Sequence, residues 1–227
     1  MTMLPLPLIA VVAAPLVAVG VAAAAIVASG SNRRLGATRE DAARVLPGDE
    51  LLDRADIQAD RAITIAATPD RVWPWIAQLG QDKGGFYSFA RLENLAGCDI
   101  HNADRIVPEW QHPQLGDPFP LHPEMVLTVG RVDPGRALVA TSKGGIAPQE
   151  TGMDFTWAFT ISALPGAPDA GPATRLHVRE RYQASSPAVR AGVEVVNLIS
   201  TVMSWRMIRT IKHLAETQAR DPADRGR

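Results

Sequence analysis

Cysteine and net charge are both scarce in this sequence of 227 residues. The single cysteine, Cys98, excludes a disulfide within the chain, so the protein needs no oxidising compartment to fold. The 23 Lys and Arg residues nearly cancel the 24 Asp and Glu residues, and a chain without a basic excess lacks the usual means of binding nucleic-acid phosphates. The sequence also lacks the Cys and His spacing of zinc fingers and any internal repeat. We therefore expect no nucleic-acid partner, no structural zinc site and no cofactor.

Charge is missing altogether from residues 1–32. Within them, residues 8–29 form an almost purely apolar run of 22 residues, which as a helix is long enough to cross about 30 Å of hydrocarbon. A cleaved signal peptide is the alternative. It is disfavoured because no Lys or Arg precedes the run, and because the run is longer than the roughly 7–15 apolar residues of such peptides. Residues 1–32 are therefore predicted to be a retained transmembrane anchor.

The distribution of arginine predicts how the anchor is oriented. Arg33, Arg34 and Arg39 follow the apolar run, and no basic side chain precedes it. Because basic residues favour the cytoplasmic side, the rest of the chain is expected to face the cytoplasm from a single-pass anchor in the cell membrane. We expect residues 33–49 to be a linker, residues 50–217 to be one domain, and residues 218–227 to be a disordered tail.

Hydrophobic periodicity predicts an α+β domain. Alternation typical of half-buried strands marks five segments, at residues 57–66, 125–132, 137–143, 154–164 and 174–184. Helices are predicted at residues 38–46, 69–79, 89–96 and 186–216. In the last of these, apolar residues recur every three or four positions from Val189 to Leu214. A curved antiparallel sheet around this C-terminal helix is the simplest way to bury that stripe.

The segment RAITIAATPDRVWPWIAQLGQ, at residues 61–81, resembles the START-like helix-grip (SRPBCC) superfamily, which includes polyketide cyclase/dehydrase and lipid-transport proteins. The blocks GGFYS, LENL, GCDIH, ADRI and PEWQ, between residues 84 and 111, further resemble a membrane-anchored bacterial branch of that group. The resemblance covers residues 60–215. It implies a hydrophobic cavity between the sheet and the C-terminal helix that holds a small apolar or amphipathic ligand, but it does not imply one chemistry.

Residues 84–110 hold the highest density of chemically capable side chains. Asp99, His101, Asp104 and Glu109 form a candidate acid–base set, since histidine and carboxylates exchange protons near neutral pH. Two alternatives remain. The carboxylates could instead cap turns and pair with arginines, or they could hold a metal, although their spacing fits no ligand motif. Cys98 is a candidate nucleophile, or simply a small buried apolar group.

Aromatic residues and one glutamate are candidates for ligand binding. Phe86, Tyr87, Trp110 and Trp157 are suited to the wall of an amphipathic site, or else belong to an ordinary core. Glu180 shares a strand face with Leu176 and Val178, so we expect it to be buried and either paired with an arginine such as Arg206 or in contact with the ligand.

The neighbouring stripe of Arg175, Arg179 and Arg181 is expected to be a solvated outer face, with contact to anionic lipid headgroups as the alternative.

Three functions are compatible with these patterns. The first is a membrane-anchored domain that binds a small hydrophobic, lipid-like or polyketide-like ligand. The second is a cyclase or dehydratase that uses Asp99, His101 and Asp104 for proton transfer. The third is a non-catalytic subunit that binds another membrane protein.

Overall fold

The computed structural model describes residues 30–95, 97–143, 152–165 and 171–220. In chain order the elements are η1 (Ser31–Arg33), β1 (Arg34–Leu35), α2 (Arg39–Ala43), η2 (Asp49–Leu51), β2 (Ile57–Ile65), α3 (Pro69–Ala77), α4 (Ala90–Leu95), η3 (Pro108–Trp110), β3 (Pro118–His122), β4 (Met125–Asp133), β5 (Ala137–Thr141), β6 (Met153–Leu164), β7 (Ala173–Ala184) and α5 (Pro187–Arg220).

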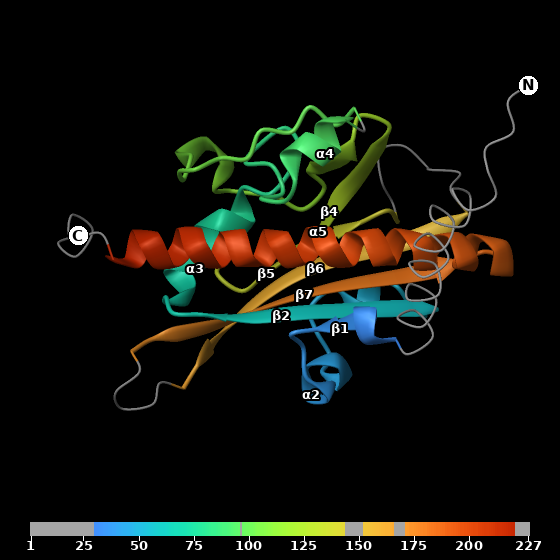
Figure 1. The fold of residues 1–227 in the computed structure, drawn as a ribbon, viewed down its shortest axis with the longest axis horizontal. Helices are drawn as coiled ribbons and strands as arrows, with labels where there is room; N and C mark the ends of the chain where they lie inside the picture. Colours follow the sequence, from blue (N-terminus) through green and yellow to red (C-terminus); the bar gives the residue numbers. More distant parts are fainter. Residues whose placement is uncertain (1–29, 96, 144–151, 166–170, 221–227) are drawn as a thin grey trace, which may run out of the picture.

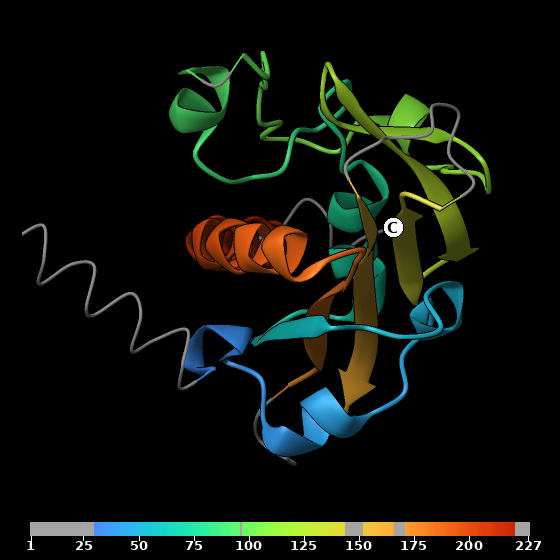
Figure 2. The same cartoon turned by 90° about the vertical axis from the view of Figure 1, so that its right-hand side faces the viewer.

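Seven strands of the described residues form one sheet, in the order β1-β2-β7-β6-β5-β4-β3. Every neighbouring pair is antiparallel except β1 and β2, which run parallel. The sheet curves around α5, which lies along its concave side (Figure 1, Figure 2). The α+β arrangement of a sheet and a long C-terminal helix is thus confirmed, and it is consistent with a helix-grip fold.

The five predicted strands are all present as β2, β4, β5, β6 and β7. The two strands that the sequence did not predict, β1 and β3, lie at the two edges of the sheet. β3 carries prolines at positions 118 and 120, which a sheet tolerates at an edge, and β1 has only two residues. Neither therefore has the length and alternation that identify a strand in a sequence.

The core lies between the sheet, α3 and α5. Phe159 and Val178 of the central strands and Ile208 and Ile211 of α5 are almost completely buried. α3 closes one end of this core with Val72 and Ile76. The N-terminal half of α5 contributes Val193 to the core, but Val195, Val196, Ile199 and Val202 in the same half are exposed. The apolar stripe of this helix is thus divided between the core and the surface.

Residues 33–49 are not a linker, as the sequence had predicted, because they fold against the convex side of the sheet. β1 pairs with β2, and α2 begins with a capping box in which Thr38 and Asp41 bind each other's backbone N–H groups. This segment contributes carboxylate and carbonyl groups that face the sheet. The folded domain therefore includes residues before position 50.

The same contacts correct the expectation for the arginine stripe of β7. Arg179 is 2% exposed, and its guanidinium donates to the Asp60 and Asp49 carboxylates and to the backbone carbonyls of Arg44, Asp41 and Ala42.

Its neighbours on β7 are held by the same segment. Arg175 binds Asp41 at 2.6 Å, and Arg181 binds the carbonyl of Leu52 at 2.9 Å. The stripe is therefore covered by residues 33–52 and is not a solvated face, because all three guanidinium groups donate to acceptors in those residues, and Arg179 also donates to Asp60 of β2.

No helix among the described residues is long and apolar enough to cross a membrane. Of the anchor predicted at residues 1–32, residues 1–29 lie outside the described residues, whereas residues 31 and 32 belong to η1, where Asn32 donates to Asn197 of α5. Of the predicted tail, residues 218–220 belong to α5, and the remainder also lies outside the described residues.

Candidate functional site

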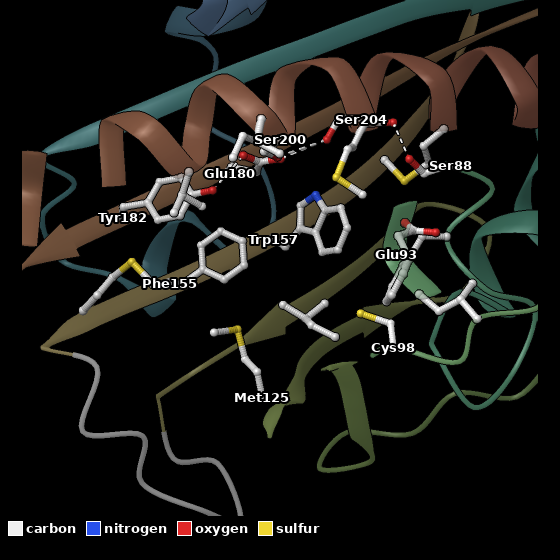
Figure 3. Close-up of a pocket in the computed structure, with 18 residues that line it drawn as sticks. Ser88, Glu93, Cys98, Met125, Phe155, Trp157, Glu180, Tyr182, Ser200 and Ser204 are labelled. Carbon is white, nitrogen blue, oxygen red and sulfur yellow. Dashed lines mark hydrogen bonds between the residues drawn. The ribbon is translucent and has the colours of Figure 1, made fainter. Parts of the chain in front are cut away.

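A cavity of about 340 Å³ lies between the N-terminal half of α5, the sheet and the segment around α4. Its walls are mainly aromatic, aliphatic and methionine side chains (Figure 3). The lining residues are Phe86, Ser88, Glu93, Cys98, Ile100, Leu121, Met125, Met153, Phe155, Trp157, Glu180, Tyr182, Val196, Ile199, Ser200, Met203, Ser204 and Met207. Apolar clefts of this size with a few polar groups are typical of small-molecule sites.

The aromatic wall is built by β6 together with its neighbours. Phe155 and Trp157 line the cavity from one face of this strand, and Trp157 packs against Phe86 with 5.6 Å between the ring centroids. Phe155 stacks on Tyr182 of β7 at 4.6 Å. These rings support one another, so the wall is formed without any ligand.

The polar side of the cavity is centred on Glu180, which is 1% exposed. Its carboxylate accepts hydrogen bonds from Tyr182 at 2.8 Å, from Ser200 at 2.6 Å and from Ser204 at 3.0 Å. Burial and the Glu180 carboxylate raise the pKa of Tyr182 well above its ordinary value, so the phenol remains a donor.

Arg61, which is fully buried, balances the charge of Glu180 at 3.2 Å. The expectation that Glu180 is buried and paired is confirmed, but its partner is Arg61 of β2 and not Arg206. Ala59 lies directly opposite Glu180 in the pairing of β2 with β7, and Arg61 lies two residues further along β2. Arg206, in contrast, is exposed on α5 and lies over the Phe89 ring.

Glu93 is the second carboxyl group in the cavity, and it is 6% exposed. Its Oε2 atom has no hydrogen-bond partner among the described residues, and neither has the buried Nε1 atom of Trp157. Burial raises the pKa of Glu93. Burial, together with the Glu93 carboxylate, also raises the pKa of Cys98. Cys98 therefore remains a thiol and behaves as part of the apolar wall, which argues against a thiolate nucleophile.

The raised pKa of Glu93 predicts a dependence of stability on pH. Between the ordinary glutamate pKa of about 4 and the higher folded value, the folded state binds more protons than the unfolded state, so the free energy of unfolding falls as the pH rises. Glu93→Gln removes this titration. We expect the variant to lose that decrease and to be the more stable protein at neutral pH.

Urea denaturation of both chains at several pH values measures this effect. Glu109→Gln, a change at an exposed glutamate, is the matched control and should keep the wild-type profile. If the free energy of unfolding depended on pH in the same way in wild type and Glu93→Gln, the raised pKa of Glu93 would be contradicted.

The residues predicted to bind a ligand divide into two groups. Phe86, Trp157 and Glu180 line the cavity. Tyr87 belongs to the core, where its hydroxyl accepts a hydrogen bond from Gln78 at 2.8 Å and its ring meets Trp75 edge to face. Trp110, in η3, is half-buried and does not line the cavity.

Residues 84–110, which include α4 and η3, are held in place by polar groups of this stretch and by Gln78, which precedes it. Gln78, which is fully buried, donates to Tyr87 and to the carbonyl of Arg105, and its Oε1 atom accepts from the backbone N–H of Val107. Asn102 accepts from the backbone N–H of Tyr87, which has a left-handed φ of 55°. Much of the chemical density in this stretch therefore fixes the loop that carries Phe86 and Ser88 into the cavity.

The predicted acid–base residues Asp99, His101, Asp104 and Glu109 are all exposed and lie outside the cavity lining. Among the described residues no group of three His, Cys, Asp or Glu side chains is arranged to hold a metal. The structure thus does not gather these residues around the space where a ligand would bind.

Several cavity residues were not singled out from the sequence, above all Glu93, Ser200 and Ser204. Glu93 had no sequence signal, because its apolar neighbours Leu92 and Leu95 are exposed while Glu93 is buried. Ser200 and Ser204 lie four residues apart, on one face of α5, and one turn of helix brings them to the same carboxylate.

No protein-family model matches the sequence, and no curated protein matches it. Solved structures similar to the chain include the di-domain ARO/CYC StfQ from the steffimycin biosynthetic pathway, with 12% identity, 76% of this chain and 54% of that chain covered, and a TM-score of 0.42. Another is the protein MLL2253 from Mesorhizobium loti, with 15% identity, coverage of 73% and 99%, and a TM-score of 0.37. A member of the major latex protein family from Arabidopsis thaliana shows 13% identity, coverage of 63% and 94%, and a TM-score of 0.27.

Proposed function

We propose that this protein binds one small, mainly apolar molecule in the cavity between α5 and the sheet. The observation that carries the proposal is the combination of an apolar cavity of about 340 Å³ with two buried polar atoms, on Glu93 and Trp157, that lack a partner among the described residues. Leaving a buried donor or acceptor unpaired costs about 1–3 kcal/mol, so a ligand that satisfies these atoms gains affinity from them.

The polar groups of the cavity define the chemistry of the ligand. The Trp157 indole offers only a donor, and Glu93, with its raised pKa, can donate or accept a proton in a hydrogen bond. Glu180 already accepts hydrogen bonds from Tyr182, Ser200 and Ser204 and is balanced by Arg61. A compact apolar molecule with a hydroxyl or carbonyl oxygen fits this set better than an anion, since no free cation lies among the lining residues.

We also propose that residues 8–29 anchor the chain in the cell membrane with the domain on the cytoplasmic side. The support for this is the uncharged run of 22 residues and the arginines that follow it. Protease protection of the carboxyl terminus in sealed vesicles tests the orientation.

Native mass spectrometry and organic extraction of the full chain in lipid nanodiscs test the binding proposal. We expect one apolar molecule for each chain, or uptake of added 1-dodecanol, which offers an apolar body and one hydroxyl. Met203→Trp places a bulky indole ring in the cavity and should weaken the binding of dodecanol at least tenfold, about 1.4 kcal/mol.

Thr210→Trp is the control, because it introduces the same residue two turns further along α5 and outside the cavity lining. It should leave binding unchanged. A chain that is empty after purification and takes up no dodecanol would overturn the proposal.

A further inference from the structure

We propose that the N-terminal half of α5, together with α4, docks on the lipid bilayer, so that the mouth of the cavity opens onto the membrane. This inference goes beyond ligand binding. It rests on the proposed membrane attachment, and its test does not depend on whether the cavity binds a ligand.

The first support is an exposed apolar surface, here called the α5 face and made of Val195, Val196, Ile199 and Val202. Each of these side chains is at least half exposed, at 61%, 50%, 59% and 61%. The positions recur at three and four residues, so they share one side of the helix. Contiguous exposed apolar patches of this kind usually mark an interaction site.

The α5 face borders the cavity. Val196 and Ile199 line the cavity and are at the same time exposed, so they form part of its mouth. Leu92 and Leu95 of α4, which are 60% and 86% exposed, extend the apolar surface from the other side of the cavity. α4 and the outer side of α5 lie on one side of the molecule, away from the sheet (Figure 2).

The second support is the place where the apolar N-terminal segment joins the domain. Residues 8–29 end directly before Gly30, and η1 is fastened to α5 within the next few residues. Asn32 donates to Asn197 at 2.9 Å, and Arg33 forms an ion pair with Glu194. Glu194 and Asn197 are the immediate neighbours of Val195 and Val196, so a membrane anchor would leave the domain beside the α5 face.

The third support is the charge that borders the face. The next exposed positions along this side of α5 are Arg206 and Arg209, and their guanidinium groups lie over the rings of Phe89 and Trp205, each 5.9 Å from the ring centroid. Arginine beside exposed aromatic and aliphatic groups suits the boundary between acyl chains and anionic headgroups. A bilayer therefore matches both the apolar face and its basic border.

Fluorescence quenching on the full chain in vesicles of phosphatidylcholine and phosphatidylglycerol tests the docking. In a Cys98→Ala background, an environment-sensitive dye is attached at Val202→Cys, or at Asp53→Cys as the matched control, an exposed position between η2 and β2. We expect spin-labelled lipids to quench the dye at position 202 several-fold more than the dye at position 53. Aqueous iodide should show the opposite order.

Three results would overturn the proposal. One is equal quenching at the two positions. Another is shielding of position 202 from both quenchers, which would mean that a protein covers the face. The third is failure of the full chain to float with the vesicles. As a further check, Val195→Glu with Ile199→Glu replaces two exposed residues and should lower quenching at position 202 to the level of the control.

Discussion

Glu180→Gln is expected to lower the free energy of unfolding by about 3–5 kcal/mol, because it leaves the charge of Arg61 buried without a counter-ion. Arg61 and Glu180 are 0% and 1% exposed in their side chains and lie 3.2 Å apart. Both side chains are thus shielded from solvent in the folded chain. The glutamine keeps nearly the same shape, so the loss reports the charge and not a change in packing. Urea denaturation of the full chain in a non-ionic detergent measures the effect.

A double variant separates the cost of leaving one buried charge unpaired from the net contribution of the ion pair to stability. Arg61→Met with Glu180→Leu removes both charges and keeps apolar volume, and replacements of this kind are often neutral or stabilising. We therefore expect the double variant to be more stable than Glu180→Gln alone. Equal stability of wild type and Glu180→Gln would show that the buried pair is not formed.

Arg179→Met is expected to cost a similar amount, about 3–5 kcal/mol, because it removes the guanidinium that forms an ion pair with the buried Asp60 carboxylate. Burial opposes the ionised form of Asp60, but hydrogen bonds from His177, Gln58 and Arg179 outweigh it and hold the pKa of this carboxyl below its usual value. The variant also frees the carbonyl groups of the N-terminal segment that Arg179 binds.

The part of the fold that loses stability first distinguishes the effect of Arg179→Met from a general loss of stability. Amide hydrogen exchange should quicken in α2 and η2, which Arg179 holds against the sheet, before it quickens in β6. Arg136→Met, at an exposed position in the turn between β4 and β5, should change stability by no more than about 0.5 kcal/mol. A loss below about 1 kcal/mol in Arg179→Met would contradict the role of this guanidinium.

Glu180 and Arg179 show that one strand, β7, places buried charged groups on both faces of the sheet. Successive side chains of β7 point to opposite faces, so Glu180 reaches the cavity side while Arg179 and Arg181 reach the convex side. The sequence showed this alternation. It did not show that both faces are covered, one by α5 and the other by residues 33–52. The arginines of β7 therefore had the sequence pattern of a solvent-exposed face, although residues 33–52 cover them.

The sequence by itself determined the local elements and their order. Alternating apolar residues specified β2 and β4 to β7, the Pro69 helix start specified α3, and the three-and-four spacing specified α5, because these patterns are properties of neighbouring residues. The aromatic wall of β6 and the burial of Glu180 followed from the same alternation.

Only the tertiary structure decided which polar residues meet. The cavity residues Glu93, Trp157 and Ser204 come from three separate elements, α4, β6 and α5. Asp99 and His101 are much closer to Glu93 in the sequence than Trp157 or Ser204 is, yet both are exposed and lie outside the cavity. The partner of Glu180 proved to be Arg61, which is distant in the chain. Long-range pairing depends on strand order and on which helix face is covered, and neither is encoded in local spacing. For that reason the chemistry of the cavity could be assigned only from the folded chain.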